Sequence, residues 1–369
     1  GLWARMVMLG RDMESRWIKS RRWDLTWLVG SVLTVPLAPL MFEAFRGWGG
    51  MGEQPAANAV AMVIMLLVGG PHVFVTFTRT NMDPKFVRNH RTYTRLAYLI
   101  PVVTALFALA YTRLFLTLFF TWTSLHVLQQ ISYVTNCYSN RQKLTPSTGE
   151  RLTEYGLIFS CLYPFATVRM VEGTFMLDGT SLYVPAFMLG PWLIYASFAI
   201  FGAFLVGWLW FVVKRAKADT LHYGKTALLG ATVGATFFTP LFPNLDVAFQ
   251  GINTWHCVQY LALIWWANRI RRERGQTELA FVRSISEGGW KGFAKYYGVS
   301  VAATAGLVAL IEGFTMVVPY IFPGHEEISW LLAYYMIGKG LLLAHYYYDT
   351  FLFTQSDELT IPAAAAAAA

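Results

Sequence analysis

The chain has 369 residues, of which 56% are hydrophobic and only 14% are charged. Soluble globular domains carry about 25% charged residues, so this composition excludes a soluble globular protein; it also excludes a disordered chain, a collagen and a coiled coil. The chain has a net charge of +8 and a mean hydropathy of +0.43. The remaining class is a polytopic membrane protein. The three cysteines form no C-x-x-C pair, which leaves neither a disulfide framework nor a cysteine metal site.

Residues 1–24 precede the first apolar run and are predicted to form a cytoplasmic amphipathic helix. Apolar side chains recur there at near-helical spacing, while basic side chains occupy the other face. The apolar positions are Leu2, Met6, Leu9, Met13 and Trp17. Such a helix lies on anionic lipid or packs against a partner subunit, and the sequence favours the two equally.

Ten apolar runs follow, each a candidate for a helix that crosses the ~30 Å hydrocarbon core of a bilayer. They are residues 25–45, 57–78, 95–112, 114–138, 152–170, 186–213, 225–242, 247–268, 297–321 and 328–353. The third and fourth runs are joined by a very tight turn. The predicted fold class is therefore all-α, a bundle of about ten transmembrane helices over 25–353. A tail at 354–369 follows, and its alanine run at 363–369 is expected to lie outside the fold.

The positions of lysine and arginine orient these spans. If the N-terminus is cytoplasmic, 25 of the 29 basic residues fall on the inner side, in segments 5–22, 79–95, 141–151, 214–225 and 269–295. This distribution follows the positive-inside rule, so it predicts cytoplasmic N- and C-termini. We expect a multi-pass protein of a bacterial inner membrane or a plasma membrane, with the lipid bilayer as its surroundings. The positive charge is then an orientation signal, and nucleic acid is excluded as a partner.

Four of the seven histidines lie inside predicted spans, on the second, fourth, eighth and tenth helices. They are His72, His126, His256 and His345. All four helices run from outside to inside, and the four positions fall within a depth band of about 9 Å. A single histidine inside a bilayer is more often an interhelical hydrogen-bonding residue. Four histidines at one depth favour a shared metal or cofactor site.

The neighbours of these histidines strengthen the prediction. Gln129 and Gln259 stand in H-x-x-Q motifs, which place each amide on the helix face of the imidazole, where it would orient substrate or ligands. Asp349 follows His345 in an H-x-x-x-D motif and would be a fifth ligand or would hold the imidazole in one tautomer. Pro71 is expected to kink its helix and aim His72 inward. The alternatives are glutamines that bridge helices and a kink that serves packing.

Imidazoles with one carboxylate suit iron, zinc, copper or manganese, and this combination favours iron and oxygen chemistry. The first hypothesis is a metal-dependent membrane oxidoreductase whose lipophilic substrate, a lipid, an isoprenoid or a quinone, enters from the inner leaflet. The first alternative is a b-type haem electron carrier with two axial histidines. The second is a transporter or a structural subunit of a larger membrane complex, with partner subunits. Histidines on helices two, four, eight and ten do not support an inverted repeat of five helices.

Two further ionisable residues lie inside predicted spans. Glu312 in the ninth span and Lys339 in the tenth are expected at similar depth, which suggests an ion pair. A structural pair is favoured over a proton relay from the outer side to the histidines.

Overall fold

The computed structural model of the protein describes residues 17–142, 146–177, 179–321, 330–355 and 359. This part is mostly helical, and six of its helices are long and apolar enough to cross a membrane. They span Arg21–Gly47, Glu53–Arg79, Arg91–Ala110, Thr112–Arg141, Trp192–Lys217 and Gly289–Val317. The all-α class is thereby confirmed, and the six helices are consistent with a multi-pass membrane protein. The count of ten spans and the orientation of the termini stay predictions.

The helical elements follow one another closely along the chain. They are α2 (Arg21–Asp24), η1 (Leu25–Val29), η2 (Gly30–Thr34), α3 (Leu37–Gly47), α4 (Glu53–Ile64), η3 (Met65–Gly69), α5 (Gly70–Arg79), α6 (Pro84–Asn89), α7 (Arg91–Ala110), α8 (Thr112–Gln142), α9 (Thr148–Ser160), α10 (Tyr163–Val171), η4 (Ala186–Met188), α11 (Trp192–Lys217), α12 (Tyr223–Phe238), η5 (Thr239–Leu241), α13 (Leu245–Glu273), α14 (Ala280–Ile285), α15 (Gly289–Ile321) and α16 (Trp330–Leu352). A short hairpin pairs β1 (Met176–Leu177) with β2 (Thr180–Ser181) in antiparallel register.

Each predicted span is helical over most of its described residues, although several boundaries differ. Only Tyr111 separates α7 from α8, as the very tight turn required. The predicted span 152–170 is divided between α9 and α10, and Pro164 lies in the first turn of the second helix. The basic segment 269–295, between the eighth and ninth predicted spans, is largely helical, because α13 runs on to Glu273, α14 fills its middle and α15 begins at Gly289. Most of the predicted amphipathic helix at 1–24 lies outside the described residues.

The chain divides into two compact units. The first unit comprises residues 1–60, 121–259 and 355–369, and the second comprises 61–120 and 260–354. Helices α4, α8 and α13 each contain a boundary between the two units, so each of these helices contributes residues to both.

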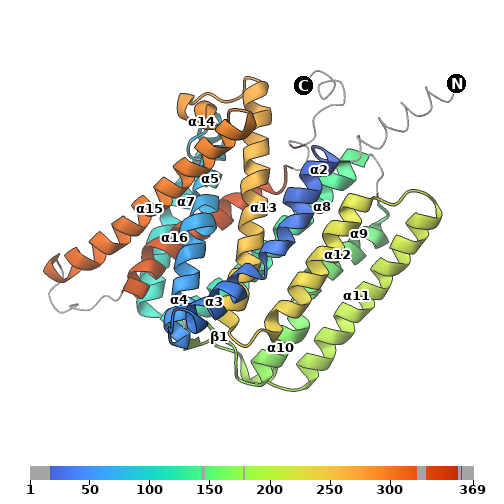
Figure 1. The fold of residues 1–369 in the computed structure, drawn as a ribbon, viewed down its shortest axis with the longest axis horizontal. Coiled ribbons are helices and arrows are strands. Elements are labelled where there is room, and N and C mark those ends of the chain that lie inside the picture. The colour runs from blue at the N-terminus through green and yellow to red at the C-terminus, as the bar shows by residue number, and fades with distance from the viewer. Residues whose placement is uncertain (1–16, 143–145, 178, 322–329, 356–358, 360–369) are drawn as a thin grey trace. The chain divides into compact units, whose positions relative to one another are not determined.

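In the first unit, α9, α11 and α12 lie side by side (Figure 1). A Cβ atom at Gly156 of α9 would lie 2.2 Å from the ring of Phe204 on α11, so glycine is what allows this close approach. Phe201 of α11 stacks on Phe237 of α12 with ring centroids 4.8 Å apart.

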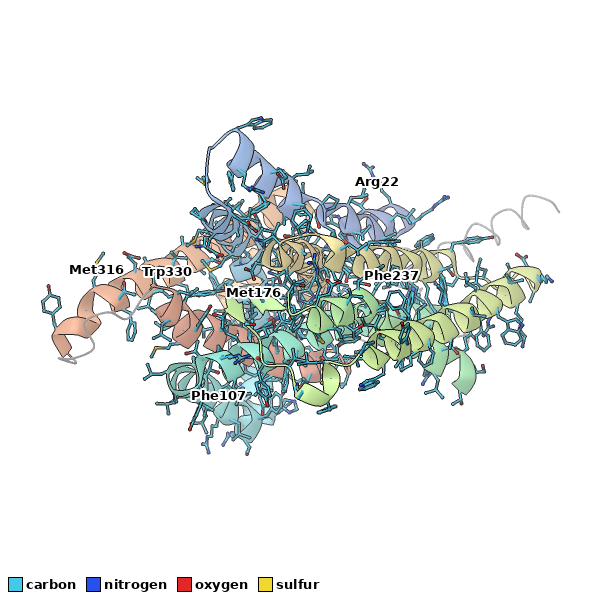
Figure 2. The ribbon with its side chains drawn as sticks, turned by 90° about the horizontal axis from the view of Figure 1, so that it is seen from below. Arg22, Phe107, Met176, Phe237, Met316 and Trp330 are labelled. Atoms are coloured by element: carbon cyan, nitrogen blue, oxygen red, sulfur yellow. The ribbon has the colours of Figure 1, made fainter. Side chains whose placement is uncertain are left out.

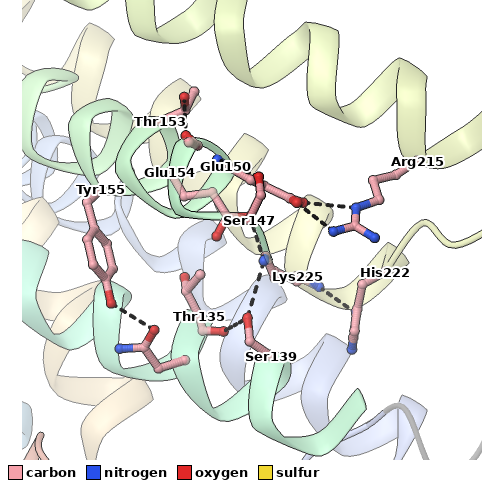
Figure 3. A network of polar contacts seen from close by, with 12 residues as sticks. Thr135, Ser139, Ser147, Glu150, Thr153, Glu154, Tyr155, Arg215, His222 and Lys225 are labelled. Atoms are coloured by element: carbon pink, nitrogen blue, oxygen red, sulfur yellow. Dashed lines mark hydrogen bonds and ion pairs between the residues drawn. The ribbon is translucent and has the colours of Figure 1, made fainter. Parts of the chain in front are cut away.

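Ion pairs join these helices at one end (Figure 3). Arg215 of α11 makes a bidentate pair with Glu150 of α9, and Lys225 of α12 lies 2.5 Å from Glu154 of α9. Lys225 also donates to Ser139 of α8. A cavity of about 40 Å³ lies among these side chains, which is room for a few water molecules. Charged groups thus tie four helices of the first unit together.

In the second unit, α7 packs along α16 and α5 packs against α15. Tyr93 of α7 stacks on Tyr347 of α16 with ring centroids 4.1 Å apart. A buried cluster around Val75, Tyr260 and Tyr296 forms the core between α5, α13 and α15. Within this apolar core, α16 also buries two polar side chains, His345 and Asp349.

The outer surfaces of both units carry large apolar side chains. Met316 on α15 is 61% exposed and points away from the ribbon (Figure 2). Leu310 on the same helix and Val206 and Trp210 on α11 are also more than half exposed. Exposed apolar side chains on helices long enough to cross a membrane fit contact with lipid.

Candidate metal centre

The four histidines predicted from the sequence are all buried, each at most 2% exposed, and Asp349 is fully buried with them. His72, His345 and Asp349 belong to the second unit, whereas His126 and His256 belong to the first. Within each unit the two histidines lie close together. The ring centroids of His72 and His345 are 4.6 Å apart, and those of His126 and His256 are 5.0 Å apart.

The local sequence before His72 interrupts the regular helix. Pro71 has no N–H for the carbonyl of Leu67, and the hydroxyl of Tyr297 donates to that carbonyl at 2.7 Å instead. The preceding turn, Met65–Gly69, is π-helical. Nδ1 of His72 forms a hydrogen bond with the carbonyl oxygen of Gly69. A carbonyl only accepts, so Nδ1 carries the hydrogen and the lone pair of the ring lies on Nε2. The helix is thus irregular before Pro71 but continuous, and the predicted kink stays a prediction.

A chain of short hydrogen bonds connects His345 to Asp349 through two other helices. Nδ1 of His345 lies 2.6 Å from the hydroxyl of Thr76 on α5, which lies 2.7 Å from the hydroxyl of Tyr260 on α13. Tyr260 donates to Oδ1 of Asp349 at 2.6 Å. All four side chains are buried. Each of the three helices α5, α13 and α16 therefore contributes to one polar cluster in the second unit.

The ligand atoms of His345 lie close to those of two other buried side chains of this unit. Nε2 of His345 lies 3.6 Å from Oδ2 of Asp349. A ring nitrogen of His72 lies within 4.8 Å of one of His345. His345 thus lies close to both the carboxylate of Asp349 and the imidazole of His72, and imidazole and carboxylate are ligands that transition metals accept.

In the first unit, glutamine side chains surround the histidine pair. Gln130 donates to Oε1 of Gln259 at 2.7 Å and to the backbone carbonyl of His256 at 3.2 Å. Gln259 in turn donates to the carbonyl of Leu28 at 2.7 Å, in the π-helical turn Leu25–Val29. The amide of Gln259 is thus engaged with protein groups on both sides. Gln129, which the H-x-x-Q motif favoured, is only half-buried.

These contacts predict different effects for the two adjacent glutamines. Replacing Gln130 by leucine is expected to cost about 1–3 kcal/mol, because buried acceptors on Gln259 and His256 lose their donor. Replacing Gln129 by leucine is expected to change stability little. Thermal unfolding of both variants in the same detergent measures the difference, and equal destabilisation would contradict the assignment of Gln130 as the buried member.

Thr76, Gln130 and Tyr260 were not predicted from the sequence as site residues, although a single sequence pattern includes all three. Each of the four histidines is followed four residues later by a polar side chain. The pairs are His72 with Thr76, His126 with Gln130, His256 with Tyr260 and His345 with Asp349. Since residues i and i+4 share a helix face, each histidine helix carries a second polar side chain one turn further on.

The buried lysine of α16 lies among aromatic rings. The amino group of Lys339 lies 4.2 Å from the ring centroid of Phe119, 4.8 Å from that of Tyr335 and 5.5 Å from that of Tyr334. Such cation–π contacts stabilise a desolvated ammonium group. Glu312, its expected partner, is exposed on α15, and the ion pair between them stays a prediction.

Comparison of the chain with protein-family models, with curated proteins and with solved structures gave no significant match.

Proposed function

We propose that the second unit binds a transition-metal ion through His72, His345 and Asp349. The observation that carries the proposal is the close approach of Nε2 of His345 and Oδ2 of Asp349, 3.6 Å apart and fully buried, beside the imidazole of His72. Buried polar groups of this kind are costly unless they bind a cation or one another. Two imidazoles and one carboxylate that leave other positions open are the ligand set of non-haem iron(II) oxygenases, so iron is the favoured metal.

The sequence predicts that His126 and His256 complete a four-histidine centre, and we retain this as part of the proposal. Their buried, closely paired rings are suited to metal ligation. Gln130 and Gln259 then hold the backbone of these helices in place rather than contact substrate, since their amides bond to one another and to backbone carbonyls.

The reaction we propose is a metal-dependent oxidation of a lipophilic substrate, a lipid, an isoprenoid or a quinone. Support comes from the donor set, which suits oxygen chemistry, and from the apolar outer faces of both units, which suit lateral entry from a membrane. The proposed setting is a plasma membrane or a bacterial inner membrane, as the basic segments predict.

Elemental analysis of the purified protein tests metal binding. We expect about one iron per chain in the wild type, and loss of the ion in His345→Ala and Asp349→Ala because each removes a ligand. His90→Ala, in the turn between α6 and α7, is the matched control and is expected to retain the ion. A folded wild type that stays metal-free after incubation with iron, zinc, copper or manganese would overturn the proposal, and a Soret absorption band would establish the haem alternative instead.

The first-unit histidines and the reaction have separate tests. If one centre uses all four histidines, His126→Ala and His256→Ala also lose the ion; retention in both would confine the centre to the second unit. Iron-loaded wild type is expected to consume oxygen when a quinol or an isoprenoid is added in detergent, and the His345→Ala variant is not. Metal binding without substrate-dependent oxygen consumption across these lipid classes would contradict the oxidoreductase.

A further inference from the structure

We propose that Thr76 and Tyr260 are positioning residues of the metal centre, which fix the tautomer of His345 and select the oxygen of Asp349 that binds the ion. The inference rests on the proposed function, since it concerns the same site. Neither residue is placed as a ligand. Both act through hydrogen bonds to a ligand.

With Asp349 ionised, as a metal ligand would be, counting hydrogens determines the direction of this series of hydrogen bonds. An ionised Asp349 only accepts, so the single hydroxyl hydrogen of Tyr260 is used at Oδ1. The contact between the hydroxyls of Thr76 and Tyr260 then takes the hydrogen of Thr76. The carbonyl of His72, at 3.4 Å from the Thr76 hydroxyl, is a longer alternative acceptor, and its use would leave the 2.7 Å hydroxyl contact without a hydrogen.

The remaining contact joins Thr76 to His345 at 2.6 Å. With the hydrogen of Thr76 already used, only the imidazole supplies one, so His345 is protonated at Nδ1, and the neutral ring that binds a metal carries its lone pair on Nε2. The same tautomer follows for His72 from its bond to the carbonyl of Gly69. Both histidines thus present Nε2 as the ligand atom.

The same series of hydrogen bonds distinguishes the two oxygens of Asp349. Tyr260 engages Oδ1, while Oδ2 lies 3.6 Å from Nε2 of His345, which is too long for a hydrogen bond. When His345 is neutral, as a metal ligand must be, the lone pairs of these two atoms repel one another at this separation unless a cation lies between them. Oδ2 is therefore the ligand oxygen, and Tyr260 holds the carboxylate in the orientation that presents it. Such partners behind metal ligands typically contribute 10- to 100-fold in metal affinity.

The test compares near-isosteric changes on α5 and α13. Thr76→Val and Tyr260→Phe each remove one hydroxyl and are expected to weaken cobalt(II) binding by about 10- to 100-fold, as measured by competition with a chelator. Thr76→Ser keeps the hydroxyl and is expected to restore binding to near the wild-type level. Thr78→Val is the matched control: Thr78 is also a buried threonine on α5, but its hydroxyl bonds to Val75 and Asn268.

The visible spectrum of bound cobalt(II) adds a readout that a merely structural role would not change. We expect shifted d–d bands in Thr76→Val and Tyr260→Phe, and an unchanged spectrum in Thr78→Val. Wild-type affinity and spectrum in Thr76→Val would overturn this inference while leaving metal binding established. An equal loss in Thr78→Val would also overturn it, because the effect would then come from helix packing. Absence of cobalt binding by the wild type would instead refute the proposed metal site.

Discussion

Replacing Lys225 by methionine is expected to lower the free energy of unfolding by about 3–5 kcal/mol, because it leaves the buried carboxylate of Glu154 without its cation. The two groups are 2.5 Å apart, and their side chains are only 12% and 7% exposed. Lys225 also donates to Ser139, so the substitution removes a contact between α12 and α8 as well. Thermal and denaturant unfolding in detergent measure the loss.

Two further variants test whether burial causes this effect. The double variant Lys225→Met with Glu154→Met removes both charges and is expected to recover most of the loss, since two apolar side chains tolerate burial better than one unpaired charge. Arg88→Met breaks an ion pair with Glu278 that is exposed on both sides, at 54% and 43%, and is expected to leave the melting temperature unchanged. A double variant as unstable as Lys225→Met would contradict this explanation.

Gly70→Ala is expected to destabilise the second unit by about 3 kcal/mol and to displace His72. A Cβ atom at this position would lie 2.1 Å from Cγ2 and 2.5 Å from Oγ1 of Thr304, so α5 and α15 would have to separate. Because His72 follows two residues later on the same helix, a separation at Gly70 also moves a proposed ligand. Unfolding and metal affinity should therefore both be affected.

A second substitution tests whether the loss comes from the steric clash with Thr304 rather than from a change in helix propensity at Gly70. Thr304→Ala leaves only the contact of 2.9 Å with Cβ, so the double variant with Gly70→Ala is expected to be more stable than Gly70→Ala alone and to bind metal more tightly. Gly202→Ala on α11 is the control, because nothing lies within 4 Å of the added Cβ atom. Failure of Thr304→Ala to rescue would contradict the close approach of α5 and α15.

Hydropathy predicted the helical class because spans in a bilayer require long apolar runs with internally satisfied backbone groups. It predicted their ends less well. The predicted span 297–321 begins at Gly289 in the structure, since polar residues at its start extend the helix without extending the apolar run. Irregular turns such as Leu25–Val29 and Met65–Gly69 accept hydrogen bonds from distant side chains, among them Gln259 and Tyr297. The sequence of the turn itself does not reveal these partners.

For the site, helix periodicity identified the four histidines and Asp349 but not their partners. Which histidines pair depends on the packing of helices far apart in the chain, such as α5 with α16. Gln129 and Gln130 both fit a turn after His126, and only the rotation of α8 makes Gln130 the buried one. Thr76 and Tyr260 are common residues in apolar helices, and they become recognisable only through the polar residue that follows every buried histidine at i+4.

X-ray absorption at the metal edge of the purified, iron-loaded protein tests the central claim most directly, because it reports the ligands themselves. The predicted result is a first shell of nitrogen and oxygen with outer-shell scattering from imidazole, which decreases in His72→Ala and His345→Ala. A shell containing sulfur or a porphyrin, or a spectrum that is the same in both variants and the wild type, would contradict a metal centre built from His72, His345 and Asp349.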